Sequence, residues 1–292
     1  MAREIRGDRE RLAFEERKVR AADRLRELGV AGSIEYAFDI PEEKDAQGDV
    51  IPAEIFWARF PAPEDDPDIP PVEGKIYVPR GTNLRDEVVL FVPGFPGGKA
   101  GRFERNYAKS LVERGSTFVT LRHNATGIET QPAEVDVFNC PERMADGRRS
   151  SEQHLGPSIA DGYTMKEIVR EPVAVLRAIH PLASKIKLAG NSAGVTSLFW
   201  SVDRLRRTHP EITDKITHLV SLAGYIGEDR EDAQGLFHGF KMKKDDLARL
   251  EIAAAKEDGV ALTEDPARFK QALRELAREL GQVQIPEHIT QV

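Results

Sequence analysis

One stretch of the sequence decides the fold: residues 186–195 read Ile-Lys-Leu-Ala-Gly-Asn-Ser-Ala-Gly-Val. The first four residues are expected to form a strand, and a helix with a buried apolar stripe is expected to begin near Val195. A serine between a strand and a helix, with glycines two residues before and after it, fits a sharp turn that holds the hydroxyl clear of the sheet. Glycines suit the flanking positions because they leave room for that turn. The pattern therefore predicts that Ser192 is a nucleophile.

Strands and helices alternate on both sides of this turn. The strand at 87–92 is a continuous apolar run, which is typical of a strand buried on both faces of a parallel sheet. Residues 33–40 and 53–60 alternate apolar and polar side chains, which predicts two antiparallel strands with a polar face at the start of the sheet. Together the segments predict an α/β fold with a mostly parallel, doubly wound sheet and helices on both faces. The remaining expected strands are 74–79, 116–121, 186–189 and 216–223, and the expected helices are 172–180, with proline first, and 195–205.

The chain divides into four expected segments. They are a charged N-terminal helix at 1–30, an α/β core at 31–224, a helical lid at 225–284 and the start of a further core strand at 285–292. In the first segment Ile5, Leu12 and Val19 recur every seven residues. This stripe predicts either an arm that packs on the body or a homodimer contact. Residues 129–163 show little periodicity and predict an irregular excursion near the site.

Composition excludes several classes of protein. The chain has 42 Lys and Arg against 49 Asp and Glu, a net charge of −7, which argues against a nucleic-acid partner. The single cysteine, Cys140, permits no internal disulfide, and the first thirty residues lack the apolar core of a signal peptide. No apolar run approaches the roughly twenty residues of a membrane helix. We therefore expect a cytoplasmic protein with no membrane partner.

A glycine-containing loop follows the strand at 87–92. Residues 93–98 read Pro-Gly-Phe-Pro-Gly-Gly, a loop with exposed backbone N–H groups, and an acyl-transfer serine needs such donors for the oxyanion it generates. The same loop could instead be a phosphate cradle, because Gly98-Lys99 resembles the end of a P-loop. That alternative fails because Pro93 stands where the first glycine belongs and Ala100 where a hydroxyl should bind Mg²⁺.

On these two motifs, residues 73–225 resemble the α/β-hydrolase family. The resemblance implies that Ser192 is the nucleophile and that the backbone N–H groups of Phe95 and Ala193 form the oxyanion hole. It implies no cofactor. The chain departs from the family where Pro93 replaces a frequent histidine and where residues 121–124, Leu-Arg-His-Asn, replace an Asp-x-Arg-Gly-like stretch.

A nucleophilic serine also needs a histidine to take its proton and a carboxylate to orient that histidine. In the family these partners follow the seventh and eighth strands, and residues 285–292 resemble only the opening of the seventh, so we expect the chain to be a fragment of a longer hydrolase. Within the chain, Asp229 beside Glu228 is an alternative acid, although both also fit a solvated charge run. His123 and His238 are substitute bases. No histidine pair has a metal-ligand spacing, so no metal is expected.

Two functions follow from the sequence. The first is a serine hydrolase that cleaves a carboxylic ester, or an amide or thioester, of a small-molecule substrate through an acyl-serine intermediate. The alternative is a catalytically inactive α/β-hydrolase-fold protein that binds a ligand or a partner.

Overall fold

An eight-stranded sheet runs through the molecule in the order β1-β2-β3-β5-β4-β6-β7-β10. The strands from β1 to β5 pair antiparallel, and those from β5 to β10 pair parallel. This confirms the predicted mostly parallel α/β sheet. The strand bounds are β1 Tyr36–Ile40, β2 Ala53–Phe60, β3 Val72–Pro79, β4 Glu87–Val92, β5 Thr117–Arg122, β6 Lys185–Asn191, β7 Ile216–Leu222 and β10 Thr290–Gln291.

The computed structural model describes most of this core. The described residues are 2–30, 34, 36–40, 42–81, 87–94, 102–123, 165–222, 282–292 and a few positions between 256 and 278. Among those few are the short paired strands β8 (Lys256–Glu257) and β9 (Val260–Ala261). The predicted excursion at 129–163 and most of the predicted helical lid at 225–284 lie outside the described residues.

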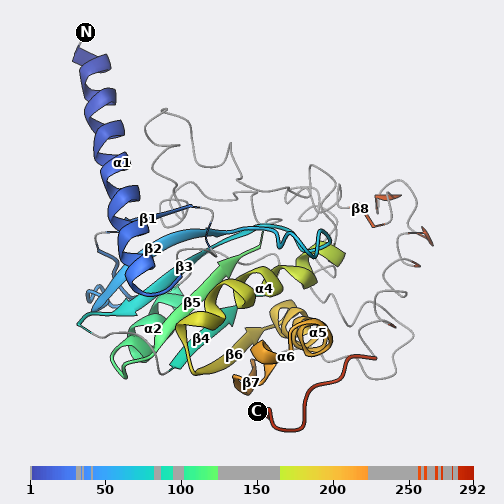
Figure 1. Cartoon of the computed structure of the whole chain (residues 1–292). Coiled ribbons are helices and arrows are strands. Elements are labelled where there is room, and N and C mark those ends of the chain that lie inside the picture. The colour runs from blue at the N-terminus through green and yellow to red at the C-terminus, as the bar shows by residue number, and fades with distance from the viewer. Residues whose placement is uncertain are drawn as a thin grey trace.

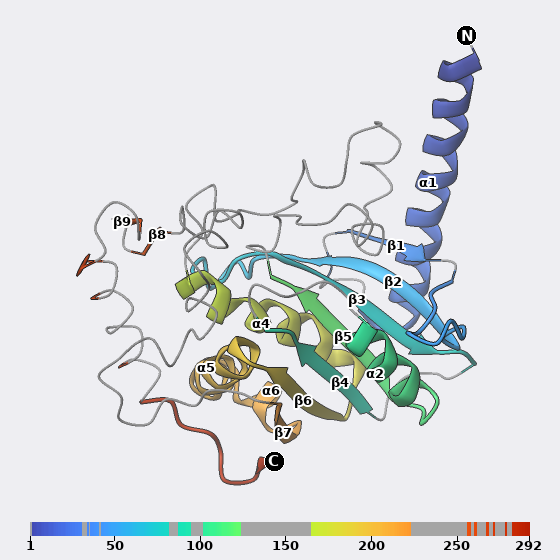
Figure 2. The same ribbon diagram turned by 180° about the vertical axis from the view of Figure 1, so that it is seen from behind.

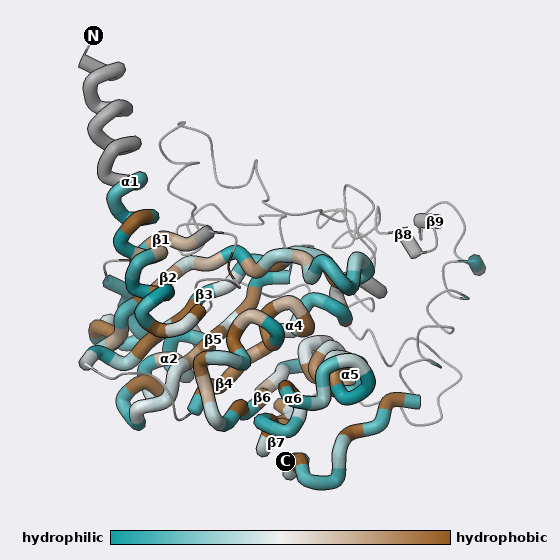
Figure 3. The backbone as a smooth tube through the Cα atoms, viewed as in Figure 1, coloured by the Kyte–Doolittle hydropathy of each residue, from teal (hydrophilic) through white to brown (hydrophobic). Residues whose placement is uncertain are grey.

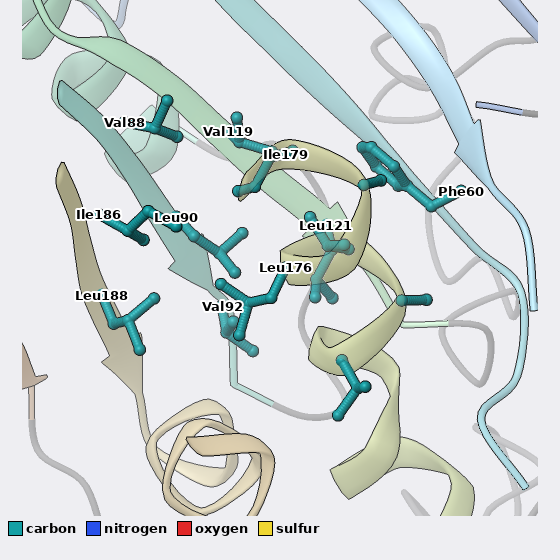
Figure 4. Packing of buried hydrophobic residues seen from close by; sticks show 14 of the residues in the cluster. Phe60, Val88, Leu90, Val92, Val119, Leu121, Leu176, Ile179, Ile186 and Leu188 are labelled. Atoms are coloured by element: carbon teal, nitrogen blue, oxygen red, sulfur yellow. The ribbon is translucent and has the colours of Figure 1, made fainter. Parts of the chain in front are cut away.

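Helices cover both faces of the sheet (Figures 1 and 2). On one face lie α4 (Met165–Ile179) and α5 (Ala193–Thr208), and on the other lies α2 (Arg102–Val112). Side chains alternate between the two faces, so that Val119 packs toward α4 and α5 while its neighbour Phe118 packs toward α2. Figure 4 shows the first of these two cores, where Leu176 and Ile179 of α4 lie over the central strands. A 3-10 turn at His180–Leu182 (η5) and the short helix α6 (Pro210–Thr213) connect neighbouring elements.

Two helices differ from the sequence-based expectation. Helix α4 begins at Met165, so the predicted start at Pro172 is wrong and this proline lies inside the helix. A proline inside a helix costs a backbone hydrogen bond. The buried face of α4 extends upstream to Val169, and such packing supplies most of a helix's stability in proteins. Helix α2 was not anticipated, although it buries Ala108 and Val112 against the second core.

The N-terminal helix α1 (Ala2–Glu27) packs beside β1 by its last turns and projects beyond the sheet at its start (Figure 1). Its described part is mostly hydrophilic (Figure 3). Ala21 and Leu25 are buried against the body, whereas Val19 is 60% exposed. The expectation that Val19 packs on the body is therefore wrong, because that side chain faces away from the docked side. The side chains of Ile5 and Leu12, the other members of the predicted stripe, lie outside those that the structure describes. The homodimer contact stays a prediction.

An ion pair fixes α1 to the sheet. The Arg24 guanidinium donates from Nε to Glu54 Oε2 at 2.7 Å and from Nη2 to Glu54 Oε1 at 3.0 Å. The Arg17 guanidinium donates to the backbone carbonyl of Asp39 at 3.0 Å and lies over the Phe38 ring. In the part of the chain that the structure describes, no helix is long and apolar enough to cross a membrane.

Candidate functional site

The candidate site lies at the edge of the sheet where the parallel strands end. Strand register aligns Val92 at the end of β4 with Gly190 near the end of β6. It also aligns Phe91 of β4 with Thr120 of β5. The residues that follow β4, β5 and β6 therefore emerge side by side at this edge, where ligands bind in open α/β sheets.

Ser192 lies at the reversal between β6 and α5. Its φ is 52° and its ψ is −125°, and it is the one non-glycine residue with positive φ in the described part of the chain. Such a conformation costs on the order of 1–3 kcal/mol and persists only where the surroundings impose it. Here the Ser192 N–H donates to the Leu222 carbonyl at 3.2 Å, and the Ser192 carbonyl accepts from the Val195 N–H at 3.0 Å. The half-buried serine is thus held in a strained turn by the next strand and the next helix.

The glycines around Ser192 are required by close backbone contacts. A Cβ at Gly190 would lie 2.8 Å from the Val195 backbone nitrogen. A Cβ at Gly194 would overlap the Val92 carbonyl oxygen and lie 2.5 Å from that of Pro93. Real Cβ atoms do not approach other atoms so closely. The spacing read from the sequence therefore has a steric cause in the structure.

The first two residues after β4, Pro93 and Gly94, lie directly against this turn. A Cβ at Gly94 would lie 2.9 Å from the Cβ of Ser192 and 3.0 Å from the Asn191 carbonyl oxygen. The two motifs singled out in the sequence are therefore neighbours in space. Phe95 lies outside the described residues. Ala193 is the first residue of α5, so its backbone N–H has no carbonyl partner one turn earlier in the helix.

His123 follows β5 and forms a buried pair with Glu171 of α4. The side chains of both residues are fully buried, and His123 Nδ1 is hydrogen-bonded to Glu171 Oε2. The other ring nitrogen, Nε2, lies 2.7 Å from the Pro93 carbonyl oxygen. Because a carbonyl oxygen can only accept, Nε2 carries the hydrogen and donates it. His123 therefore links α4 to the first residue of the loop after β4.

Opposing effects act on the pKa of His123. Burial alone lowers the pKa, but the charge of Glu171, its hydrogen bond and the bond to the Pro93 carbonyl raise it more, so the net shift is upward. An imidazolium can donate from both ring nitrogens, as these two acceptors require. With both nitrogens engaged, His123 is poorly suited to be the base for Ser192, the role that the sequence left open.

Glu171 was not identified from the sequence, because the predicted helix began one residue later, at Pro172. The signal was nonetheless present, since this glutamate lies one helical turn before Ala174 and Val175, which are apolar in the sequence and buried in the structure. A carboxylate on an apolar helix face needs a buried partner. His123, at the carboxyl edge of the sheet, supplies that partner.

The remaining described histidines lie in other settings. They are His180 at the end of α4, His209 between α5 and α6, His218 within β7 and His288, whose Nε2 lies 3.1 Å from the Thr213 carbonyl oxygen. The candidate acids Glu228 and Asp229 and the candidate base His238 lie outside the described residues, so their roles stay predictions. Within the described ranges, no group of three or more His, Cys, Asp or Glu side chains could hold a metal ion.

Comparison with known proteins gives structural neighbours only. No protein-family model matches the chain, and no curated protein matches it significantly. Est1E from Butyrivibrio proteoclasticus is 15% identical over 52% of this chain, with a TM-score of 0.33, and the chain spans about half (47%) of its length. Brefeldin A esterase, a bacterial homologue of human hormone-sensitive lipase, is 13% identical over 91% of this chain and 75% of its own, with a TM-score of 0.42. A dienelactone hydrolase from Anabaena variabilis is 16% identical over 76% of this chain and 79% of its own, with a TM-score of 0.33.

Proposed function

We propose that the protein is a serine hydrolase that cleaves a carboxylic ester, or an amide or thioester, through an acyl-serine at Ser192. In the first step the Ser192 Oγ attacks the carbonyl carbon while a general base takes the hydroxyl proton. The carbonyl oxygen becomes an oxyanion, and its collapse expels the leaving group, which receives the proton. Water then attacks the acyl-serine and releases the carboxylic acid.

One observation carries this proposal: a strained serine with the glycine of a second loop against it. The backbone of Ser192 has a positive φ that a serine adopts only under constraint, and Gly94 leaves room beside its side chain. Neither feature is needed for an ordinary connection between a strand and a helix. Both suit a hydroxyl that must be presented to a substrate.

The same arrangement suits stabilisation of the oxyanion. We propose that the backbone N–H groups of Phe95 and Ala193 are the two donors, since one follows Gly94 and the other opens α5. Losing one such donor typically costs about 10²–10³ in kcat. The partners that complete the chemistry, an acid and a base, are not assigned to described residues.

Replacement of the serine tests the function directly. With a p-nitrophenyl acyl ester as substrate, Ser192→Ala is expected to lower the turnover of the full-length protein by a factor on the order of 10⁶, because the proposed acyl intermediate forms on this hydroxyl. The matched control is Ser110→Ala, an exposed serine on α2, which should retain wild-type turnover. Unchanged turnover in Ser192→Ala would reject the proposal. A wild-type protein without turnover would favour the inactive binding protein instead.

A further inference from the structure

The buried His123–Glu171 pair has no part in the acyl chemistry proposed above. Removing both groups from water is costly, and a buried ion pair is by itself weak evidence for stability. The pair nevertheless contacts one defined backbone group, the carbonyl of Pro93, and Pro93 is the first residue of the loop that would carry an oxyanion donor. We call residues 93–98 the oxyanion loop.

We propose that His123, held by Glu171, is a positioning residue that sets the orientation of the oxyanion loop against Ser192. The inference rests on the proposed hydrolase function and adds to it a residue that acts through the backbone. His123 would touch neither the substrate nor the reacting atoms. Its effect would pass through the peptide unit between Pro93 and Gly94.

Neighbouring groups on two sides restrict the orientation of this peptide unit. The Pro93 carbonyl oxygen accepts from His123 Nε2 at 2.7 Å, and the backbone of Gly194 lies so near that a Cβ there would be 2.5 Å from the same oxygen. The next residue, Gly94, abuts Ser192. With the carbonyl fixed, the plane of the peptide unit is fixed as well, up to the Cα of Gly94.

Histidine is the side chain that can make both contacts at once. Its two nitrogens lie on different edges of a rigid ring, so that one faces Glu171 and the other faces Pro93. An asparagine places its amide near the position of Nδ1, and a glutamine places its amide near the position of Nε2. These two replacements therefore separate the contact with Glu171 from the contact with Pro93.

Loss of the contact between His123 and Pro93 is expected to lower kcat. An oxyanion exists in the transition state and not in the bound ester, so a displaced donor should lower kcat and leave KM nearly unchanged. His123→Asn, which loses the donor to Pro93, is expected to lower kcat about 10- to 100-fold, somewhat less than deletion of a whole donor. His123→Gln keeps a donor for the Pro93 carbonyl and should stay within a few-fold of wild type.

Steady-state kinetics of the full-length protein and both variants, with a p-nitrophenyl ester, provide the test. A purely structural role predicts a different order, because glutamine abandons Glu171 and asparagine retains it, so activity should then fall more in His123→Gln. That order, or a kcat for His123→Asn equal to wild type, would overturn the inference while leaving Ser192 as nucleophile. An inactive wild-type protein would overturn the proposed function, and the inference with it.

A second measurement does not depend on the variants folding. In the wild-type protein, ¹⁵N chemical shifts of the His123 ring should show a hydrogen on Nε2 throughout the pH range of activity. An unprotonated Nε2 could not donate to the Pro93 carbonyl and would overturn the inference whatever the kinetics show.

Discussion

At the residue scale, Ser192 is the position that sequence and structure describe most alike. The residues two positions before and after it are glycines in the sequence, and in the structure backbone atoms occupy the space that a side chain at either position would need. Apart from this glycine spacing, nothing in the sequence indicates that Ser192 has a positive φ. Local sequence could predict the turn because the residues that mark it lie within five positions, although the carbonyls that exclude a side chain at Gly194 belong to Val92 and Pro93.

The His123–Glu171 pair could not be predicted in the same way. The two residues are 48 positions apart, and they meet only because α4 crosses the sheet next to the end of β5. Sequence placed His123 at the correct edge of the sheet but left its role open. The acceptor at Nε2 is a backbone carbonyl, which no side-chain motif can reveal.

The raised pKa of His123 predicts how this pair contributes to stability at different pH. A group whose pKa is higher in the folded state stabilises it fully below the unfolded-state pKa, whose ordinary value is 6.5, and this contribution is lost as pH rises through the folded-state pKa. The difference in unfolding free energy between wild type and His123→Gln should therefore shrink above pH 6.5. Urea denaturation at several pH values from about 6 to 9 measures it. A difference that grows with pH would contradict the prediction.

At the element scale, the strands follow the sequence more closely than the helices do. The bounds of β2 and β4 coincide with the predicted 53–60 and 87–92, because continuous or alternating apolar residues end at prolines or polar loops. Helix α4 starts seven residues before Pro172, where packing outweighs the local effect of proline. Tertiary contacts decide helix ends that local sequence leaves open.

Docking of α1 is expected to depend on Leu25 and not on Val19. Leu25→Ala should destabilise the protein by about 2–5 kcal/mol, as loss of a buried leucine side chain generally does. The matched control is Val19→Ala on the exposed side of the same helix, for which a change within about 0.5 kcal/mol is expected. Denaturant unfolding compares the two. Equal effects of both substitutions would mean that α1 does not dock through its buried face.

At the scale of the whole molecule, the parallel half of the sheet brings distant segments to one edge. Strands β4, β5 and β6 end together there, so that the segments beginning at Pro93, His123 and Ser192 become neighbours. The alternation of strands and helices predicted this gathering, since it follows from topology. Substrate preference could not be predicted, because it depends on side chains around the edge and not on strand order.

The identity of Ser192 as the nucleophile is tested most directly by covalent labelling. A fluorophosphonate should form one adduct per molecule of full-length protein, and peptide mapping by mass spectrometry should place it on Ser192, with no adduct in Ser192→Ala. An unlabelled wild-type protein, or an adduct on another serine, would contradict the assignment of this turn as the site of acyl chemistry.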